Sequence, residues 1–189
     1  MLLSSNFNRS ATKRSKGYFF PFLFTLFLCG MFACKDDAED TVTRYLKWNK
    51  QNMEFFENAK TLTDENGNLY YEEVCPNWDT TSCVLMHHYT YGESTETPYY
   101  SSYIKVCYRG ELIDGIGFDS THVSPANPMT IQLSSLVDGW AAALEKMHPG
   151  DSCRVVIPQN LGYGASSRGA IKPYSTLIFD IKLLEITRQ

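Results

Sequence analysis

The sequence predicts an α+β domain in which one short helix covers one face of a mostly antiparallel sheet. The 189-residue chain is 43% hydrophobic and 14% aromatic, which indicates a globular protein rather than a disordered one. A single stretch, LSSLVDGWAAALEKMHPG at residues 133–150, carries apolar residues at helical spacing. The other apolar runs of the second half are short, and turn residues separate them. We therefore expect one helix among five or six strands.

Residues 1–33 have the pattern of a secretory signal peptide. A basic segment containing Arg9, Lys13, Arg14 and Lys16 precedes an apolar run at 18–32 that is rich in Phe and Leu. This run is too short for a comfortable membrane span. The segment holds four of the 17 basic residues, so the remaining chain has 13 basic against 21 acidic side chains, a net charge of −8. Such an acidic surface argues against nucleic-acid binding and against electrostatic attachment to anionic lipid.

Cys34 directly follows the small residue Ala33, and this arrangement resembles a bacterial lipobox. The resemblance implies that Cys34 becomes the lipidated first residue of the mature chain. It also implies a lipid anchor in the cell envelope of a Gram-negative bacterium, at the outer membrane on its periplasmic or surface face. Met31 and Phe32 depart from the usual leucine and small residue of such boxes. An ordinary signal peptide with an incidental cysteine is the alternative.

Four cysteines remain once Cys29 and Cys34 are set aside: Cys75, Cys83, Cys107 and Cys153. Disulfides persist in exported proteins, and three pairings are open. One of them is a local bridge between Cys75 and Cys83, while Cys107 and Cys153 lie in strand-like runs and fit buried thiols equally well. No cysteine or histidine spacing indicates a zinc site, and neighbouring His87 and His88 would point to opposite faces of a strand.

Residues 34–82 are predicted to be a tether and an N-terminal helical extension. A helix is expected at 41–60, with Leu46, Met53, Phe56 and Ala59 as its apolar points, and a short strand is expected at 69–71. Docking on the main domain, pairing with a second copy and a spacer role are all open for this extension, and so is the oligomeric state.

Residues 83–189 are predicted to form the main domain. Its expected strands are 83–91, 103–108, 117–119, 129–133, 153–157 and 176–186, with a turn at 109–115. Ser135 and Asp138 have the spacing of a capping box, which predicts a helix start there. Pro149 and Gly150 are expected to end this helix. One helical face would carry Val137, Trp140, Ala141 and Leu144.

From Val106 onward the order of motifs resembles the FKBP-type peptidyl-prolyl cis-trans isomerases. The matching pieces are VCYRG at 106–110, FDS at 118–120, LVDGWAAAL at 136–144, GYG at 162–164 and TLIFDIKLLEI at 176–186. This resemblance implies an FKBP-like curved antiparallel β-sheet wrapped on one short α-helix, with the N-terminal helical extension in front.

The resemblance also implies a proline-binding pocket. Its catalytic residues would be Trp140 as the floor, Phe118 and Tyr108 as walls, Asp119 at the edge and the Tyr163 hydroxyl at the rim. Its substrate-binding residues would be Met129, Val137 with its backbone N–H, Ile171 with an N–H nearby, and Phe179. Asp119 would orient Tyr108 or polarise the substrate carbonyl, and the alternative is an aspartate that only stabilises a turn. The family often has an aromatic where Met129 stands, and the rim loop 165–172 lacks the aromatic or histidine that many members carry.

The implied activity is rotation of X–Pro bonds in exported proteins, which assists their folding and requires no metal or cofactor. Expected partners are proline-containing polypeptides and macrolide inhibitors of this family. Two alternatives are an FKBP-fold binding module or chaperone with little catalysis, and a structural lipoprotein that assembles through its N-terminal helix.

Overall fold

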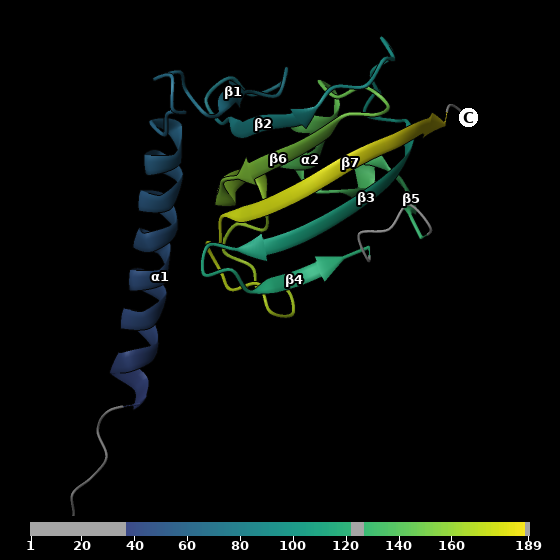
Figure 1. Ribbon diagram of the computed structural model, residues 1–189. Coiled ribbons are helices and arrows are strands. Elements are labelled where there is room, and N and C mark those ends of the chain that lie inside the picture. Colours follow the sequence, from purple (N-terminus) through teal and green to yellow (C-terminus); the bar gives the residue numbers. More distant parts are fainter. Residues whose placement is uncertain (1–36, 122–126, 188–189) are drawn as a thin grey trace, which may run out of the picture. The chain divides into compact units, whose positions relative to one another are not determined.

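The computed structural model describes residues 37–121 and 127–187, and it confirms the predicted α+β fold (Figure 1). The predicted signal peptide, Cys34 and His122 lie outside the described residues. The helices are α1 (Asp37–Lys60) and α2 (Asp138–Leu144), with short 3₁₀ turns at Leu133–Ser135 and Gln159–Leu161. The strands are β1 (Glu72–Val74), β2 (Val84–Thr90), β3 (Tyr103–Leu112), β4 (Gly117–Ser120), β5 (Met129–Gln132), β6 (Ser152–Ile157) and β7 (Leu177–Thr187).

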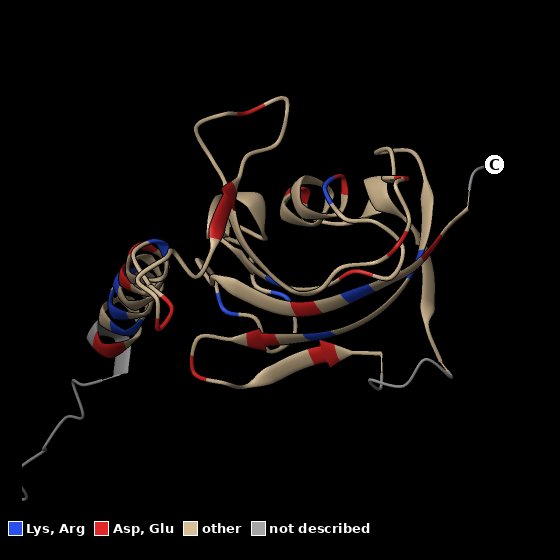
Figure 2. Ribbon diagram, turned by 45° about the horizontal axis from the view of Figure 1, so that its top comes forward, with Lys and Arg blue, Asp and Glu red and all other residues tan. Residues whose placement is uncertain are grey.

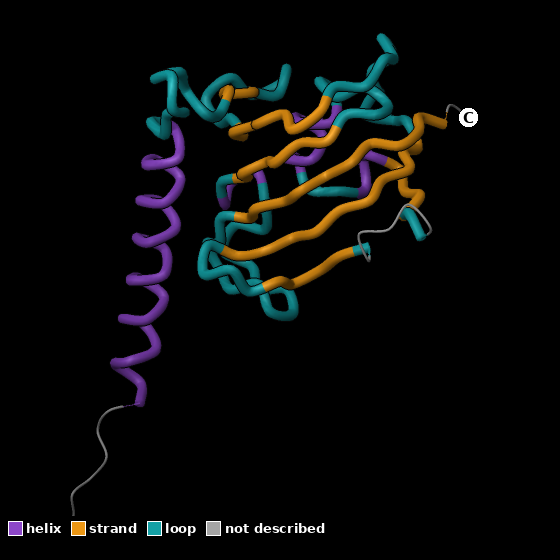
Figure 3. Tube along the Cα trace, in the orientation of Figure 1, coloured by secondary structure: helices purple, strands orange, loops and turns teal. Residues whose placement is uncertain are grey.

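All of these strands pair antiparallel in the order β1-β2-β6-β7-β3-β4, and β5 pairs with β3 as well. The sheet curves around α2, which lies on one of its faces (Figures 2 and 3). β7 is central because it pairs with β3 over residues 177–187 and with β6 over residues 177–182. Its side chains alternate between the two faces, so residues 177 and 179 reach the main core and residue 178 faces the other way.

β3 is longer than predicted, and the predicted start of a turn at Arg109 and Gly110 is wrong. Both residues stay in the strand, where they pair with Asp180 and Phe179 of β7. The chain reverses only at Gly115, whose φ of +78° favours glycine. A long partner strand supplies hydrogen bonds to the whole of β3, and this outweighs the local turn signal.

α2 is confirmed, but the predicted capping box is wrong. Ser135 lies in the preceding 3₁₀ turn, where its Oγ donates to the Gln132 carbonyl oxygen at 2.7 Å. Val137 is the N-cap and makes no side-chain cap. The helix ends at Leu144, before the predicted stop. Every residue of the helix except Asp138 is buried, rather than one stripe alone, and a Cβ on Gly139 would lie 2.3 Å from Ile157 Cγ2. The helix therefore packs directly on β6.

α1 packs on the domain through a different face from the predicted one. Phe56 and Ala59 are buried as expected, but Leu46 and Met53 are 66% and 58% exposed. Trp48 and Asn52 occupy the inner face instead. Asn52 Oδ1 accepts the Thr176 N–H at 2.7 Å, so a polar residue holds a position that the apolar pattern could not identify.

Two cores lie on opposite faces of the sheet. The larger one surrounds α2 and includes Trp48. The smaller one is formed by Phe56 and Ala59 of α1 with Leu85, Val156 and Ile178 of three neighbouring strands. α1 thus contributes to both cores, and it covers part of the face that α2 leaves open.

Cys75 and Cys83 form a disulfide, which is the local pairing among the three left open. Cys107 and Cys153 are buried and lie outside this disulfide, and burial raises the pKa of the Cys153 thiol to about 12. The predicted strand at 69–71 is wrong, because Leu69 makes only an isolated bridge with Thr63. The strand β1 begins just after it, at Glu72.

Neither helix in the described ranges has the apolar length that would cross a membrane.

Candidate functional site

A cavity of about 600 Å³ opens beside α2, and all nine predicted pocket residues line it. They come from β3, β4, β5, α2, β7 and the loops that precede α2 and β7. These residues are Tyr108, Phe118, Asp119, Met129, Val137, Trp140, Tyr163, Ile171 and Phe179. Residues far apart in the chain therefore meet around one hollow, although their individual roles remain predictions.

Trp140 forms the base of the cavity and is only 2% exposed. The Tyr108 and Phe179 rings meet its indole edge-on, with ring centroids 5.2 and 5.1 Å away. Phe118 meets Phe179 in the same manner at 5.4 Å. Such edge-to-face contacts are favourable and fix the orientation of each ring. The result is an aromatic base and wall in which each ring is held by contact with another ring.

Gly110 is required between two of these walls, and sequence reasoning did not single it out. A Cβ at this position would lie 2.6 Å from Phe118 Cζ and 2.8 Å from Phe179 Cε1. A glycine inside a strand often marks such a close approach, and this was the signal available in the sequence.

Tyr108 and Asp119 form the polar edge of the cavity. The Tyr108 hydroxyl donates to Asp119 Oδ2 at 2.6 Å. Burial, together with this hydrogen bond and the carboxylate charge, raises the pKa of Tyr108 far above its usual value. The phenol therefore remains a donor at physiological pH, and the carboxylate fixes its direction. This geometry agrees with the orienting role expected of Asp119.

The two backbone donors expected at the cavity differ in their availability. The Ile171 N–H already donates to the Arg168 carbonyl oxygen at 2.8 Å. Among residues 37–121 and 127–187, by contrast, the Val137 N–H has no acceptor within the protein. Val137 lines the cavity at the start of α2, so its N–H stays the backbone donor that we expect to meet a substrate carbonyl.

Four further residues line the cavity and were not predicted: Ile131, Ser135, Leu136 and Arg168. Leu136 stands inside the motif that begins α2, and Arg168 stands in the rim loop 165–172. The missing aromatic drew attention to this loop, but the charge that it does carry was overlooked. No group of His, Cys, Asp or Glu side chains in the described ranges has the arrangement of a metal site.

Residues 94–184 match the family model of the FKBP-type peptidyl-prolyl cis-trans isomerases. The chain is 31% identical over 164 residues to the FKBP-type isomerase FkpA of Buchnera aphidicola, covering 84% of this chain and 65% of that protein. It is 34% identical over 107 residues to FkpA of Escherichia coli, covering 57% of this chain and 39% of that protein. The chain therefore spans less than two thirds of the length of these curated relatives.

Two crystal structures share the fold. The peptidyl-prolyl cis-trans isomerase of Pseudomonas syringae superposes with a TM-score of 0.62 at 27% identity, over 76% of this chain and 96% of the other. FkpA of Escherichia coli superposes with a TM-score of 0.65 at 25% identity, over 79% of this chain and 63% of the other.

Proposed function

Because residues 94–184 form an FKBP-type peptidyl-prolyl cis-trans isomerase domain, we propose that this protein accelerates rotation about X–Pro bonds in exported polypeptides. The observation that carries the proposal is the convergence of nine family-pattern residues on one cavity with Trp140 at its base. Proline-containing polypeptides are the substrates, and macrolide inhibitors of the family compete for the same hollow.

The reaction makes modest chemical demands. Rotation of an X–Pro bond crosses a barrier of about 18–20 kcal/mol because twisting the amide removes its resonance. Uncatalysed rotation takes on the order of 10–100 s. No covalent bond forms or breaks, so catalysis consists of binding the twisted amide more tightly than either planar form. A millionfold acceleration needs about 8 kcal/mol of such preference.

The cavity supplies that preference through its apolar walls and its few polar groups. A twisted amide is less charge-separated than a planar one, so it is stabilised relative to the planar form against the apolar rings beside Trp140. Phe118 and Phe179 enclose the proline ring. The Val137 N–H donates a hydrogen bond to a substrate carbonyl. The hydrogen-bonded pair of Tyr108 and Asp119 forms the polar edge of the cavity, beside the rotating X–Pro bond.

We propose that the chain acts in the cell envelope, anchored by lipid on Cys34 after removal of residues 1–33. The basic and apolar segments that precede Cys34 support this location. Mass spectrometry of the mature N-terminus tests it. An unmodified cysteine, or cleavage elsewhere, would contradict the anchor without bearing on the isomerase.

Prolyl isomerisation of a short X–Pro peptide tests the enzymatic proposal. Asp119→Leu is the informative variant because Asp119 is exposed and outside the core, so the protein should stay folded. We expect a rate loss of at least about tenfold, in line with removal of a positioned catalytic group. Trp140→Leu should lose more. Lys182→Gln is an exposed control on β7 and should retain the full rate. Equal rates in all four proteins would exclude the cavity as the site.

A binding module or chaperone with little catalysis is the second candidate. It is favoured by Met129, whose flexible side chain lines the cavity where an aromatic wall is usual. Suppression of aggregation of an unfolded client by the Asp119→Leu protein, at the wild-type level, would support this candidate over the enzyme.

A further inference from the structure

We propose that Arg168 makes the rim of the cavity a binding site for a carboxylate side chain next to the substrate proline. The preferred substrates would then carry Glu or Asp directly beside that proline. This inference rests on the proposed isomerase function, since it concerns the same cavity.

Arg168 lies on the rim loop 165–172 and lines the cavity. Its backbone is held by a tight hairpin, in which the Arg168 N–H donates to the Ile171 carbonyl oxygen at 3.0 Å and the Ile171 N–H donates back at 2.8 Å. Gly169 allows the reversal with a φ of +54°. Because Ile171 forms part of the apolar lining, this hairpin fixes the Arg168 backbone against the wall of the proline socket.

The side chain of Arg168 is directed over a second cavity residue. Its guanidinium carbon lies 5.4 Å from the centroid of the Tyr163 ring, within the range of a cation–π contact. Tyr163 is the rim residue whose hydroxyl is expected to meet a substrate carbonyl. A side chain that neighbours the bound proline therefore comes within reach of the guanidinium.

Arg168 has no acidic partner in the described ranges, whereas the other arginines there do. Arg44 pairs with Asp40, Arg109 with Glu111, and Arg154 with both Glu111 and Asp180. A guanidinium presents a planar fork of donors that matches a carboxylate. Arg168 thus offers at the rim an unused site for an anionic side chain.

The cavity's own carboxylate does not occupy this site. Asp119 accepts the Tyr108 hydroxyl and makes no ion pair with Arg168 within the described residues. The two charges belong to separate elements, with Asp119 on β4 and Arg168 on the rim loop. The cavity therefore has a negative edge and a positive edge, and the second one selects the substrate.

Matched peptides test the proposal. One series carries Glu, Gln or Lys immediately before the proline, and a second carries them immediately after it. We expect kcat/KM for a Glu peptide to exceed that for its Gln counterpart by about threefold at low salt, as typical of an exposed ion pair. The ratio should fall toward one at high salt. It should also be one in Arg168→Gln and reversed in Arg168→Glu.

Lys172→Gln is the matched control, because it removes a cation from the same loop that does not line the cavity. The Lys172 Nζ lies 4.1 Å from the Trp48 ring centroid and 3.8 Å from Asp114 Oδ2. This variant should keep the wild-type Glu/Gln ratio.

The two proposals fail in different ways. Absence of turnover of every Gln peptide would overturn the isomerase, and the ratio of equilibrium dissociation constants for Glu and Gln peptides would then still decide the subsite. Turnover with a Glu/Gln ratio that is one in wild type, or unchanged in Arg168→Gln, would overturn the subsite alone.

Discussion

The Trp48 indole donates a hydrogen bond from Nε1 to Ser175 Oγ at 3.0 Å, which joins α1 to the segment just before β7. Ser175 Oγ in turn donates to the Lys172 carbonyl oxygen at 2.7 Å. This segment connects two cavity residues, Ile171 at its start and Phe179 beyond its end. α1 therefore holds in place the stretch of chain that carries two walls of the cavity.

We predict that Trp48→Phe lowers the free energy of unfolding by about 1 kcal/mol, because a buried hydrogen bond is lost while most of the ring remains. Urea denaturation followed by circular dichroism measures it. Trp78→Phe is the control, since Trp78 is 51% exposed and its replacement should have little effect. An equal loss in both variants would contradict the assigned role of Trp48.

The hydrogen bond between Tyr108 and Asp119 predicts non-additive effects on activity. Tyr108→Phe and Asp119→Asn should each lower kcat/KM, and the double variant should be little worse than the poorer single one, because each change breaks the same contact. A double-mutant cycle in the peptide assay measures the coupling, for which we expect about 1–3 kcal/mol. Fully additive losses would mean that Asp119 acts independently of Tyr108.

Gly110→Ala should reduce catalysis by displacing the rings of Phe118 and Phe179. We expect a loss of about tenfold in kcat/KM, since small misplacements of groups around a reacting centre are costly. Gly117→Ala serves as the control, because the nearest atom to its added Cβ is 3.8 Å away. Unchanged activity in Gly110→Ala would show that the socket tolerates movement of both rings.

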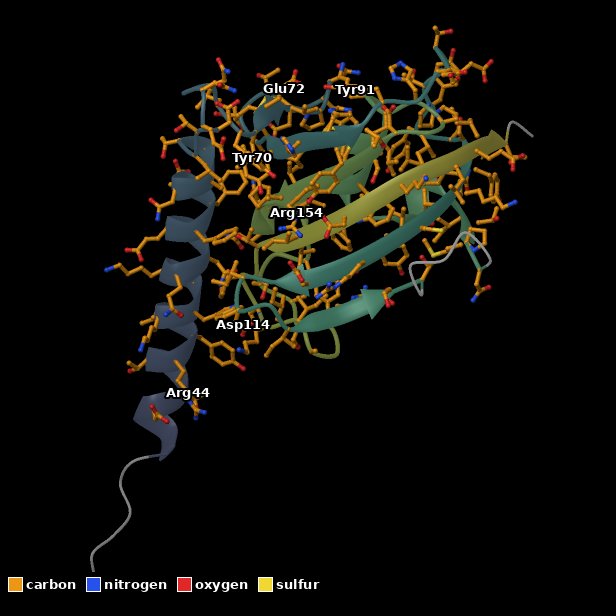
Figure 4. All side chains as sticks on the ribbon, viewed as in Figure 1. Arg44, Tyr70, Glu72, Tyr91, Asp114 and Arg154 are labelled. Atoms are coloured by element: carbon orange, nitrogen blue, oxygen red, sulfur yellow. A yellow bond between two sulfur atoms is a disulfide. The ribbon has the colours of Figure 1, made fainter. Side chains whose placement is uncertain are left out.

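The ion pair between Asp180 and Arg154 leads us to expect a loss of stability at low pH. It accepts two hydrogen bonds from Arg154 at 2.8 Å, on the sheet face opposite α2 where Figure 4 labels Arg154. Burial alone would raise the Asp180 pKa, but the hydrogen bonds and charge of Arg154 outweigh it and lower the pKa. A depressed folded-state pKa stabilises the protein above the unfolded value of about 3.9, and this contribution is lost as pH falls through the folded value.

Asp180→Asn should therefore cost stability at pH 7, and its difference from wild type should narrow below about pH 4. We expect the free energy of unfolding to fall by no more than about 1 kcal/mol at pH 7. The side chains of Arg154 and Asp180 are both about a third exposed, so solvent screens their interaction. Urea titrations at pH 7 and pH 3 measure the change. Glu185→Gln, at an exposed pair with Lys105, should differ little from wild type at either pH. If the difference in unfolding free energy between Asp180→Asn and wild type were the same at pH 7 and pH 3, the lowered pKa of Asp180 would not contribute to stability.

The sequence predicted the fold and the cavity well because both follow from strong signals. The apolar run at 176–186 indicates the strand β7, and the order of motifs around Trp140 identifies nine of the thirteen residues that line the cavity. Features that depend on contacts with residues far away in the sequence were not predicted. The length of β3 is set by β7, and the buried position of Asn52 is set by the Thr176 N–H. Arg168 was overlooked because its position on the cavity depends on the folding of a loop.

The small core beneath α1 has a practical consequence for recombinant work. A shortened protein that starts at Cys83 would lack Phe56 and Ala59, so Leu85, Val156 and Ile178 would form a bare apolar surface. Such surfaces promote self-association. A soluble, crystallisable version should therefore begin near Asp37 and keep the whole helix, even when only the proposed isomerase activity is of interest.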